Sequence, residues 1–210
     1  DLIMDVGNSH TCGILVEDHL DELNGLKQTY ELNLRDLSQP HYVYNELFDS
    51  RVEFSQAEFG KRNFSVESGR EQAFVWPSIV RVGREASRMA LQRMGTEGST
   101  GLSSPRRYLW DEEEYLHGWR FNTLNQAQQE PSATALPLTF LLNDQGQPLY
   151  DQPLDERLPV FSAHYSRSSL MTFMLSELLA QALMQINSVA QRLKMTHSSA
   201  PRQLRIIYII

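Results

Sequence analysis

The sequence predicts an α/β protein in which a mixed sheet packs against a long helix and carries an inserted smaller subdomain. The first 35 residues read as three strands joined by short links, which favours an antiparallel meander. Residues 168–195 repeat apolar side chains at three- and four-residue steps, the spacing of an amphipathic helix. An apolar run over 204–210 follows that helix, and this order predicts a final strand, buried on both faces, that lies parallel to another strand.

The strands of the meander differ in pattern. Residues 2–6 and 11–16 are apolar runs that flank a short polar turn, so they predict a hairpin. From Leu26 to Arg35 apolar and polar residues alternate with period 2, which predicts a single third strand with one buried face. A further strand over 79–83 and a short helix over 84–94 follow a stretch without a dominant period.

The helix predicted over 168–195 is the strongest in the chain. Serines at 166, 168 and 169 can cap its start, because a hydroxyl there accepts from a free backbone N–H. We interpret its apolar stripe as core: Leu170, Phe173, Met174, Leu178, Ala182, Ile186, Val189 and Leu193. We therefore assign residues 1–37 and 160–210 to the core of the protein, and the irregular residues 38–159 to the inserted subdomain.

Composition excludes an intrinsically disordered protein, a collagen-like repeat and a disulfide scaffold. A hydrophobic content of 41% with 21% charged residues is that of an ordinary globular chain. The net charge of −7 disfavours nucleic acid as a partner. Cys12 is the single cysteine, so no intrachain disulfide can form, and a reducing cytoplasm is the expected location. No run approaches 18 apolar residues, so we expect no transmembrane segment, and no secretory signal is apparent.

The two ends of the sequence both lie inside apolar, strand-like runs. The chain opens at Asp1 without an initiator methionine, and it closes on Ile210. Termini usually lie in polar, exposed segments, so we expect this chain to be a fragment of a longer protein. The six histidines show no metal-ligand spacing, and the sequence therefore predicts no metal site built on histidine.

The segment Asp5-Val6-Gly7-Asn8-Ser9-His10-Thr11 is the sharpest motif in the sequence. Glycine permits close approach of the backbone to a ligand, and turn amides and hydroxyls can bind phosphate oxygens. An aspartate at the end of the strand can hold a hydrated magnesium ion. An ordinary hairpin, in which Asp5 and Asn8 satisfy turn amides, explains the same residues.

This hairpin resembles the first phosphate motif of the actin, Hsp70 and sugar-kinase superfamily of ATPases. Pro77-Ser78-Ile79-Val80 is similar to the Pro-Ser strand of Hsp70-type proteins, and Val82-Gly83-Arg84-Glu85-Ala86 to their Val-Gly-x-x-Ala segment. Ser104-Pro105-Arg106-Arg107-Tyr108-Leu109 falls where those proteins carry a Lys-Arg pair. The resemblance implies a ribonuclease-H-like core, in which the long helix and the strand over 206–210 close the first lobe.

A narrower resemblance is to the N-terminal region of the bacterial SrfB virulence-factor family. It rests on Trp76-Pro77-Ser78, on Gly95-Thr96-Glu97-Gly98, and on the segment over 103–111, Ser-Ser-Pro-Arg-Arg-Tyr-Leu-Trp-Asp. Members of that family are longer than this chain. The resemblance implies a virulence-linked protein with an actin- or Hsp70-like nucleotide-binding fold, and it leaves the substrate undefined.

The wider resemblance implies ATP and Mg²⁺ as cofactors and assigns roles to individual residues. Asp5 would act in catalysis by holding magnesium through water, and Arg106 would replace the lysine that positions the attacking water or the γ-phosphate. The residues expected to line the phosphate-binding hairpin are Gly7, Asn8, Ser9 and Thr11. Arginine binds phosphate bidentately but is larger and planar, so it can preserve binding while altering hydrolysis.

Two functions remain open at this stage. The whole protein would bind and hydrolyse ATP between two lobes, and the second lobe is absent from this chain, so the isolated fragment would be inactive. The alternative is a non-catalytic interaction or scaffold module that kept the fold without the ATPase activity. If the first reading holds, Asp5, Ser9 and Arg106 must converge on one cleft, because a magnesium-bound triphosphate spans only a short distance.

Overall fold

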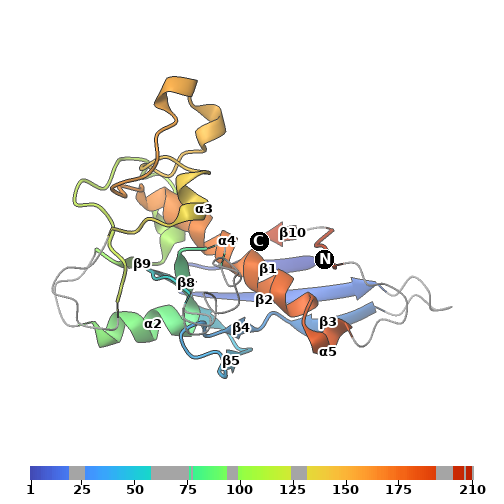
Figure 1. Ribbon diagram of the computed structural model, residues 1–210. Coiled ribbons are helices and arrows are strands. Elements are labelled where there is room, and N and C mark those ends of the chain that lie inside the picture. Colours follow the sequence, from blue (N-terminus) through green and yellow to red (C-terminus); the bar gives the residue numbers. More distant parts are fainter. Residues whose placement is uncertain are drawn as a thin grey trace, which may run out of the picture.

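The computed structural model describes most of the chain, namely residues 1–18, 27–57, 76, 78–93, 99–123, 132–192, 201–205 and 207–209. Its largest sheet has the order β10-β1-β2-β3, with the short strand β6 also paired to β2 (Figure 1). The strands of this sheet are β1 (Leu2–Val6), β2 (His10–Asp18), β3 (Lys27–Glu31), β6 (Phe48–Asp49) and β10 (Ile207–Ile209).

The predicted meander is confirmed, because β1 pairs antiparallel with β2 and β2 antiparallel with β3. The final strand β10 lies in the same sheet, parallel to β1, with Leu2 opposite Ile207. The expectation that this strand is buried on both faces is wrong, since Ile207 is 42% and Ile209 51% exposed. The reason is its position: among the described residues β10 pairs with β1 alone, so it forms an edge of this sheet.

The alternating run that predicts one third strand is divided between two sheets. β3 ends at Glu31, and β4 (Leu34–Arg35) pairs with β5 (Val43–Tyr44) in a separate ribbon. Between them the amide of Leu32 donates to the carbonyl of Gly13 at 2.8 Å, and the amide of Asn33 to Gln185 Oε1 at 2.8 Å. The side chain of Gln185 therefore accepts a backbone N–H. In one continuous strand, that N–H would have bonded a neighbouring strand. Leu26 lies outside the described residues.

A second sheet and a short helix come from the middle of the chain. β7 (Arg51–Phe54) lies between β8 (Val80–Val82) and β9 (Gly101–Ser103), antiparallel to both. α2 (Gly83–Gln92) follows β8 directly and agrees closely with the predicted short helix. The remaining short elements are η1 (Pro105–Tyr108), α3 (Leu136–Thr139), η2 (Leu149–Asp151) and η3 (Leu154–Glu156).

The long helix is α4 (Arg167–Ile186), and it crosses the face of the large sheet (Figure 1). Ser166 caps it, as predicted, by accepting the amide of Ser169 on its hydroxyl at 3.2 Å. The predicted extension to residue 195 is wrong. Asn187 ends the helix: its Nδ2 donates to the carbonyls of Leu183 and Arg202, and its Oδ1 accepts the Arg202 amide at 2.8 Å.

After this break a short helix, α5 (Val189–Arg192), follows. Val189 is 75% exposed, so the apolar stripe predicted for the helix ends at Ile186. Residues 193–195 lie outside the described part of the chain. Asn187 thus ends α4 and hydrogen-bonds the segment that leads into β10. Its position within an apolar helical pattern does not predict this role.

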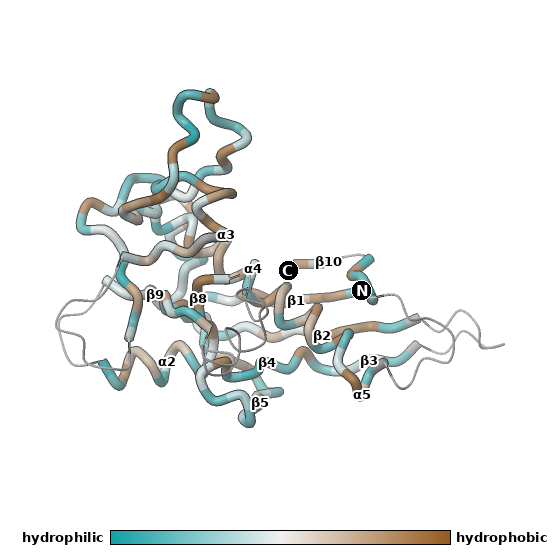
Figure 2. Tube along the Cα trace, in the orientation of Figure 1, coloured by the Kyte–Doolittle hydropathy of each residue, from teal (hydrophilic) through white to brown (hydrophobic). Residues whose placement is uncertain are grey.

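One apolar cluster joins the large sheet, the second sheet and α4. Leu2 and Met4 of β1 belong to it together with Phe54 of β7, and the Phe54 ring lies 5.8 Å from that of Phe173 and 5.5 Å from that of Trp119. Figure 2 shows largely apolar stretches along β1 and α4. Residues of the predicted insertion therefore share the core of the flanking segments, and the division at residues 37 and 160 stays a prediction.

α4 is, within the described residues, the helix that is long and apolar enough to cross a membrane by length and composition. Half of its most apolar window is buried inside the protein. Its buried face also carries Glu177 and Gln181, which hydrogen-bond within the protein.

Candidate functional site

The turn between β1 and β2 is tight because glycine stands at its first position. The amide of Gly7 donates to the carbonyl of His10 at 3.0 Å. A Cβ at Gly7 would lie 2.7 Å from that oxygen, so only glycine fits without a backbone shift. A second tie comes from Ser50, whose amide donates to the Ser9 carbonyl at 2.9 Å and whose hydroxyl donates to the Gly7 carbonyl at 2.8 Å.

The polar residues of the predicted phosphate motif divide into two groups. Asp5, Asn8 and Ser9 are exposed. Thr11 is fully buried, and its hydroxyl shares a hydrogen bond of 2.7 Å with the Ser50 hydroxyl. The structure therefore leaves Asp5, Asn8 and Ser9 accessible to a ligand, whereas the Thr11 hydroxyl serves the packing of the hairpin.

Arg106 comes to the hairpin from a distant part of the sequence. Its Nη1 donates to the Val6 carbonyl at 2.6 Å, next to Asp5 in β1. The preceding turn is held by Ser104, whose amide donates to the Ser50 carbonyl. Ser104 has a φ of 56°, a conformation that costs a non-glycine residue of order 1 kcal/mol or more. Ser50 therefore fixes both the hairpin and the turn that presents Arg106.

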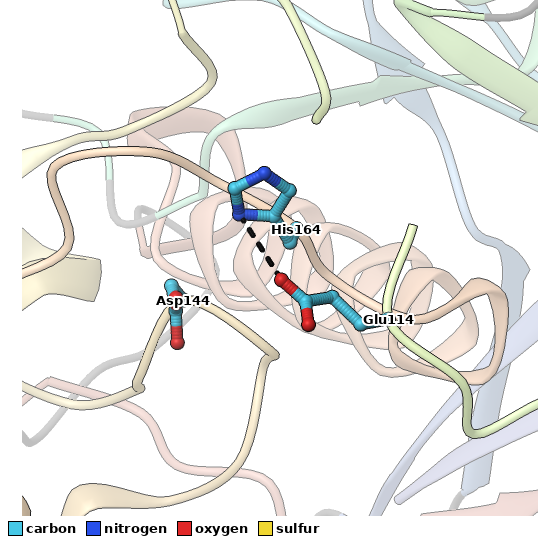
Figure 3. A group of neighbouring side chains, drawn as sticks. All are labelled: Glu114, Asp144 and His164. Atoms are coloured by element: carbon cyan, nitrogen blue, oxygen red, sulfur yellow. Dashed lines mark ion pairs between the residues drawn. The ribbon is translucent and has the colours of Figure 1, made fainter. Parts of the chain in front are cut away.

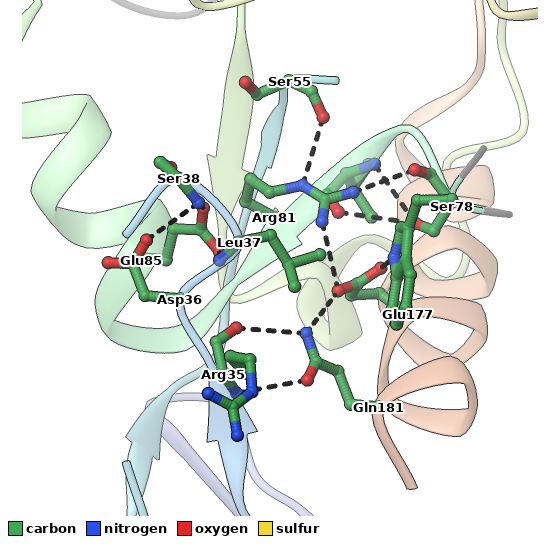
Figure 4. Close-up of polar contacts among 12 residues, drawn as sticks. Arg35, Asp36, Leu37, Ser38, Ser55, Ser78, Arg81, Glu85, Glu177 and Gln181 are labelled. Atoms are coloured by element: carbon green, nitrogen blue, oxygen red, sulfur yellow. Dashed lines mark hydrogen bonds and ion pairs between the residues drawn. The ribbon is translucent and has the colours of Figure 1, made fainter. Parts of the chain in front are cut away.

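A buried polar network surrounds Arg81 of β8 (Figure 4). Neither Arg81 nor Glu177 stands out in the sequence. Arg81 is fully buried, and its guanidinium donates to the carbonyls of Ser55 and Ser78 and, at 3.3 Å, to Glu177 Oε1. Gln181 donates to the same carboxylate oxygen at 2.9 Å and also accepts the Arg35 amide. The network joins α4 to β8 and β4.

Burial raises the pKa of Glu177, and the Arg81 guanidinium and the donors Trp76 and Gln181 partly oppose this rise. Glu85 on α2 is a second buried carboxylate, and burial raises its pKa as well. It accepts the amides of Leu37 and Ser38 at 3.0 Å and 2.8 Å. Both carboxylates satisfy donors inside the protein, so this network supports the fold and does not form an accessible site.

The signal for this network is present in the sequence but weak. Glu177 and Gln181 are four residues apart, on the turns of α4 that also carry Met174 and Leu178. A carboxylate and an amide inside an apolar stripe indicate a polar partner in the core, because unpaired polar groups are costly to bury. The partner itself, Arg81, lies 96 residues earlier and only the folded chain identifies it.

The described residues thus form a mixed α/β protein with an accessible polar hairpin beside an arginine. The family model described as "Virulence factor SrfB" matches residues 1–210, so the chain belongs to the SrfB family. No curated protein and no solved structure matches the chain. The narrower of the two predicted resemblances is confirmed, and the comparisons give no support to the wider one, to actin and Hsp70 ATPases.

Proposed function

We propose that the β1–β2 hairpin binds the phosphates of a magnesium nucleotide in the SrfB-family protein to which this chain belongs. The main support is the contact that brings Arg106 to Val6 across 100 residues of sequence, with 2.6 Å between Nη1 and the carbonyl oxygen. Phosphate binding needs a cationic donor beside backbone and hydroxyl donors. Arg106 and the exposed turn at Asn8 and Ser9 provide these groups in one place.

The residues of the hairpin fit a hydrated magnesium ion as well as a phosphate. Asp5 is an exposed carboxylate at the end of a core strand, so it would hold magnesium through water. When bound, the ion would neutralise charge on the phosphates. Gly7 would let the phosphates approach the backbone, because no side chain extends from it. Thr11 would act indirectly, by fixing Ser50 under the turn.

The order of strands supports placing this hairpin in a ribonuclease-H-like lobe. Such a lobe requires the first and the last strand to share one sheet, and β1 and β10 do so, parallel to each other. A fold does not by itself define an activity. ATP hydrolysis in the whole protein is therefore a further step of the proposal, with Asp5 and Arg106 as its catalytic residues.

One observation favours the alternative, a non-catalytic interaction module. Arg106 already donates to the Val6 carbonyl, Thr11 shares a hydrogen bond with Ser50, and the Ser50 hydroxyl donates to the Gly7 carbonyl. These contacts stabilise a tight turn without any ligand. A hairpin that kept its shape and lost its chemistry would have the same contacts.

Titration of the full-length protein with magnesium ATP, followed by calorimetry, separates the two functions. We expect the wild-type protein to bind magnesium ATP. In the Asp5→Ala variant, the affinity for ATP should be independent of magnesium. Arg106→Ala should weaken binding by at least about tenfold, because a charge-assisted hydrogen bond contributes about 1.5–3 kcal/mol. Arg107→Ala is the matched control, since Arg107 is an exposed arginine on the same short helix, and it should leave binding unchanged. No binding at millimolar nucleotide would overturn the proposal and favour the interaction module.

A further inference from the structure

Three potential metal ligands meet in a part of the fold that the proposed nucleotide site does not use. Figure 3 shows Glu114, Asp144 and His164 near one another on three separate segments, with an ion pair between Glu114 and His164. One ligand atom from each residue lies within 4.8 Å of the other two. His164 and Asp144 are half-buried and Glu114 is exposed, so the group is open to solvent on one side.

The backbone holds the three segments together. The amide of His164 donates to the carbonyl of Asp144 at 2.8 Å, and the amide of Tyr115 donates to the carbonyl of His164 at 3.1 Å. The segment before α4 therefore lies between the other two and is bonded to both. The ligands are placed by main-chain contacts, and a bound ion would not have to collect them from separate positions.

The imidazole of His164 has a buried nitrogen without a hydrogen-bond partner. Its Nδ1 is inaccessible to solvent and lies 3.4 Å from Glu114 Oε1. That separation is longer than a normal N–H···O hydrogen bond, at about 2.7–3.2 Å. It equals the distance between two ligands of a tetrahedral ion, about 3.4 Å for bonds of about 2.1 Å. The two atoms are thus spaced as ligands of a common ion.

We propose that Glu114, Asp144 and His164 bind a divalent transition-metal ion, with Zn²⁺ as the ion that fits best. An imidazole nitrogen with two carboxylates suits zinc, whereas Mg²⁺ and Ca²⁺ prefer oxygen ligands in larger number. Three protein ligands leave a fourth position for water on the exposed side. The ion would join three segments that contain little regular secondary structure, independently of any nucleotide at the hairpin.

The test uses the full chain after treatment with a chelator, titrated with ZnCl₂ and followed by calorimetry. We expect one ion per chain. His164→Ala and Asp144→Asn should each weaken binding by at least about 100-fold, because loss of an outer-shell partner alone costs about 10- to 100-fold. His10→Ala is the matched control: His10 faces Asp49 at 3.7 Å but belongs to no three-ligand group among the described residues, so its loss should leave binding unchanged.

A thermal readout keeps the test valid if a variant folds poorly. Zinc should raise the melting temperature of the wild-type chain and of His10→Ala, and it should leave that of Asp144→Asn unchanged. Asn has nearly the shape of Asp, so this variant should fold. The proposal is overturned if the wild-type chain binds no zinc at micromolar concentration. It is equally overturned if Asp144→Asn and His164→Ala bind zinc as the wild type does.

Discussion

The buried ion pair between Arg81 and Glu177 leads to a prediction about Arg81→Met. Both side chains are 1% exposed, and 3.3 Å separates Arg81 Nη1 from Glu177 Oε1. Methionine fills much of the same volume but carries no charge. The substitution therefore leaves a carboxylate in the core without its cation, which is the costly way to break a buried pair.

Protonation of Glu177 limits the size of this effect. A carboxyl with the ordinary pKa of 4.5 takes up a proton at pH 7 at a cost of about 3 kcal/mol, from about 1.4 kcal/mol per pH unit. We expect Arg81→Met to lower the free energy of unfolding by about that amount, at the lower end of the range of about 3–5 kcal/mol for broken buried pairs.

The same argument fixes the sign of the pH dependence. Burial raises the pKa of Glu177 in the folded state, so folded protein keeps a proton that unfolded protein releases. In Arg81→Met, where no cation opposes this rise, stability should fall as the pH increases from about 4.5 to 7, by up to about 1.4 kcal/mol per unit.

Urea unfolding followed by far-ultraviolet circular dichroism measures both effects. Glu177→Gln is the informative partner substitution, because it keeps the shape and removes the charge. Alone it should destabilise the protein, since Arg81 then lacks a counter-charge, but in the Arg81→Met background it should stabilise the protein and abolish the pH slope. Equal effects of Glu177→Gln in both backgrounds, within about 0.5 kcal/mol, would refute the reasoning.

Three further predictions concern single side chains. Ser166→Ala removes the cap of α4 and should lower the free energy of unfolding by about 1 kcal/mol in urea; no change would contradict this role. Gly7→Ala places a Cβ 2.7 Å from the His10 carbonyl and should cost about 1–3 kcal/mol, where a neutral result would show a more pliable turn. Burial raises the pKa of Tyr30 to about 12, so stability should fall as the pH rises from 10 to 12, and Tyr30→Phe should reduce that fall; an identical alkaline profile would exclude Tyr30 as a cause.

Local sequence patterns predict the helices and strands of this protein well where the pattern of side chains within a segment decides its secondary structure. The meander follows from the apolar runs of β1 and β2, because a strand buried on one face needs apolar residues at every second position. The start of α4 follows from Ser166, since a hydroxyl cap acts within one turn of the helix. The resemblance of short segments to the SrfB family is likewise a property of the sequence, and the family match confirms it.

Local patterns fail where a distant partner takes a backbone group. Gln185 of α4 accepts the Asn33 amide and so divides the predicted third strand, and Asn187 binds Arg202 and so ends the predicted long helix. Both side chains act on segments that are distant in sequence or beyond the helix end. The hydrogen bonds of these side chains replace backbone hydrogen bonds of a regular strand or helix. The periodicity of apolar residues in the sequence does not indicate them.

The sequence by itself determined the strands of the meander, the start of the long helix and the accessible polar turn, because each depends on neighbours a few residues apart. Only the tertiary structure decided which polar groups meet. Arg81 finds Glu177 in the core, Arg106 reaches Val6, and His164 comes to lie 3.4 Å from Glu114. Electrostatic and metal-ligand contacts depend on distances in space of a few ångströms, and spacing along the chain sets no such distance once the chain has folded back on itself.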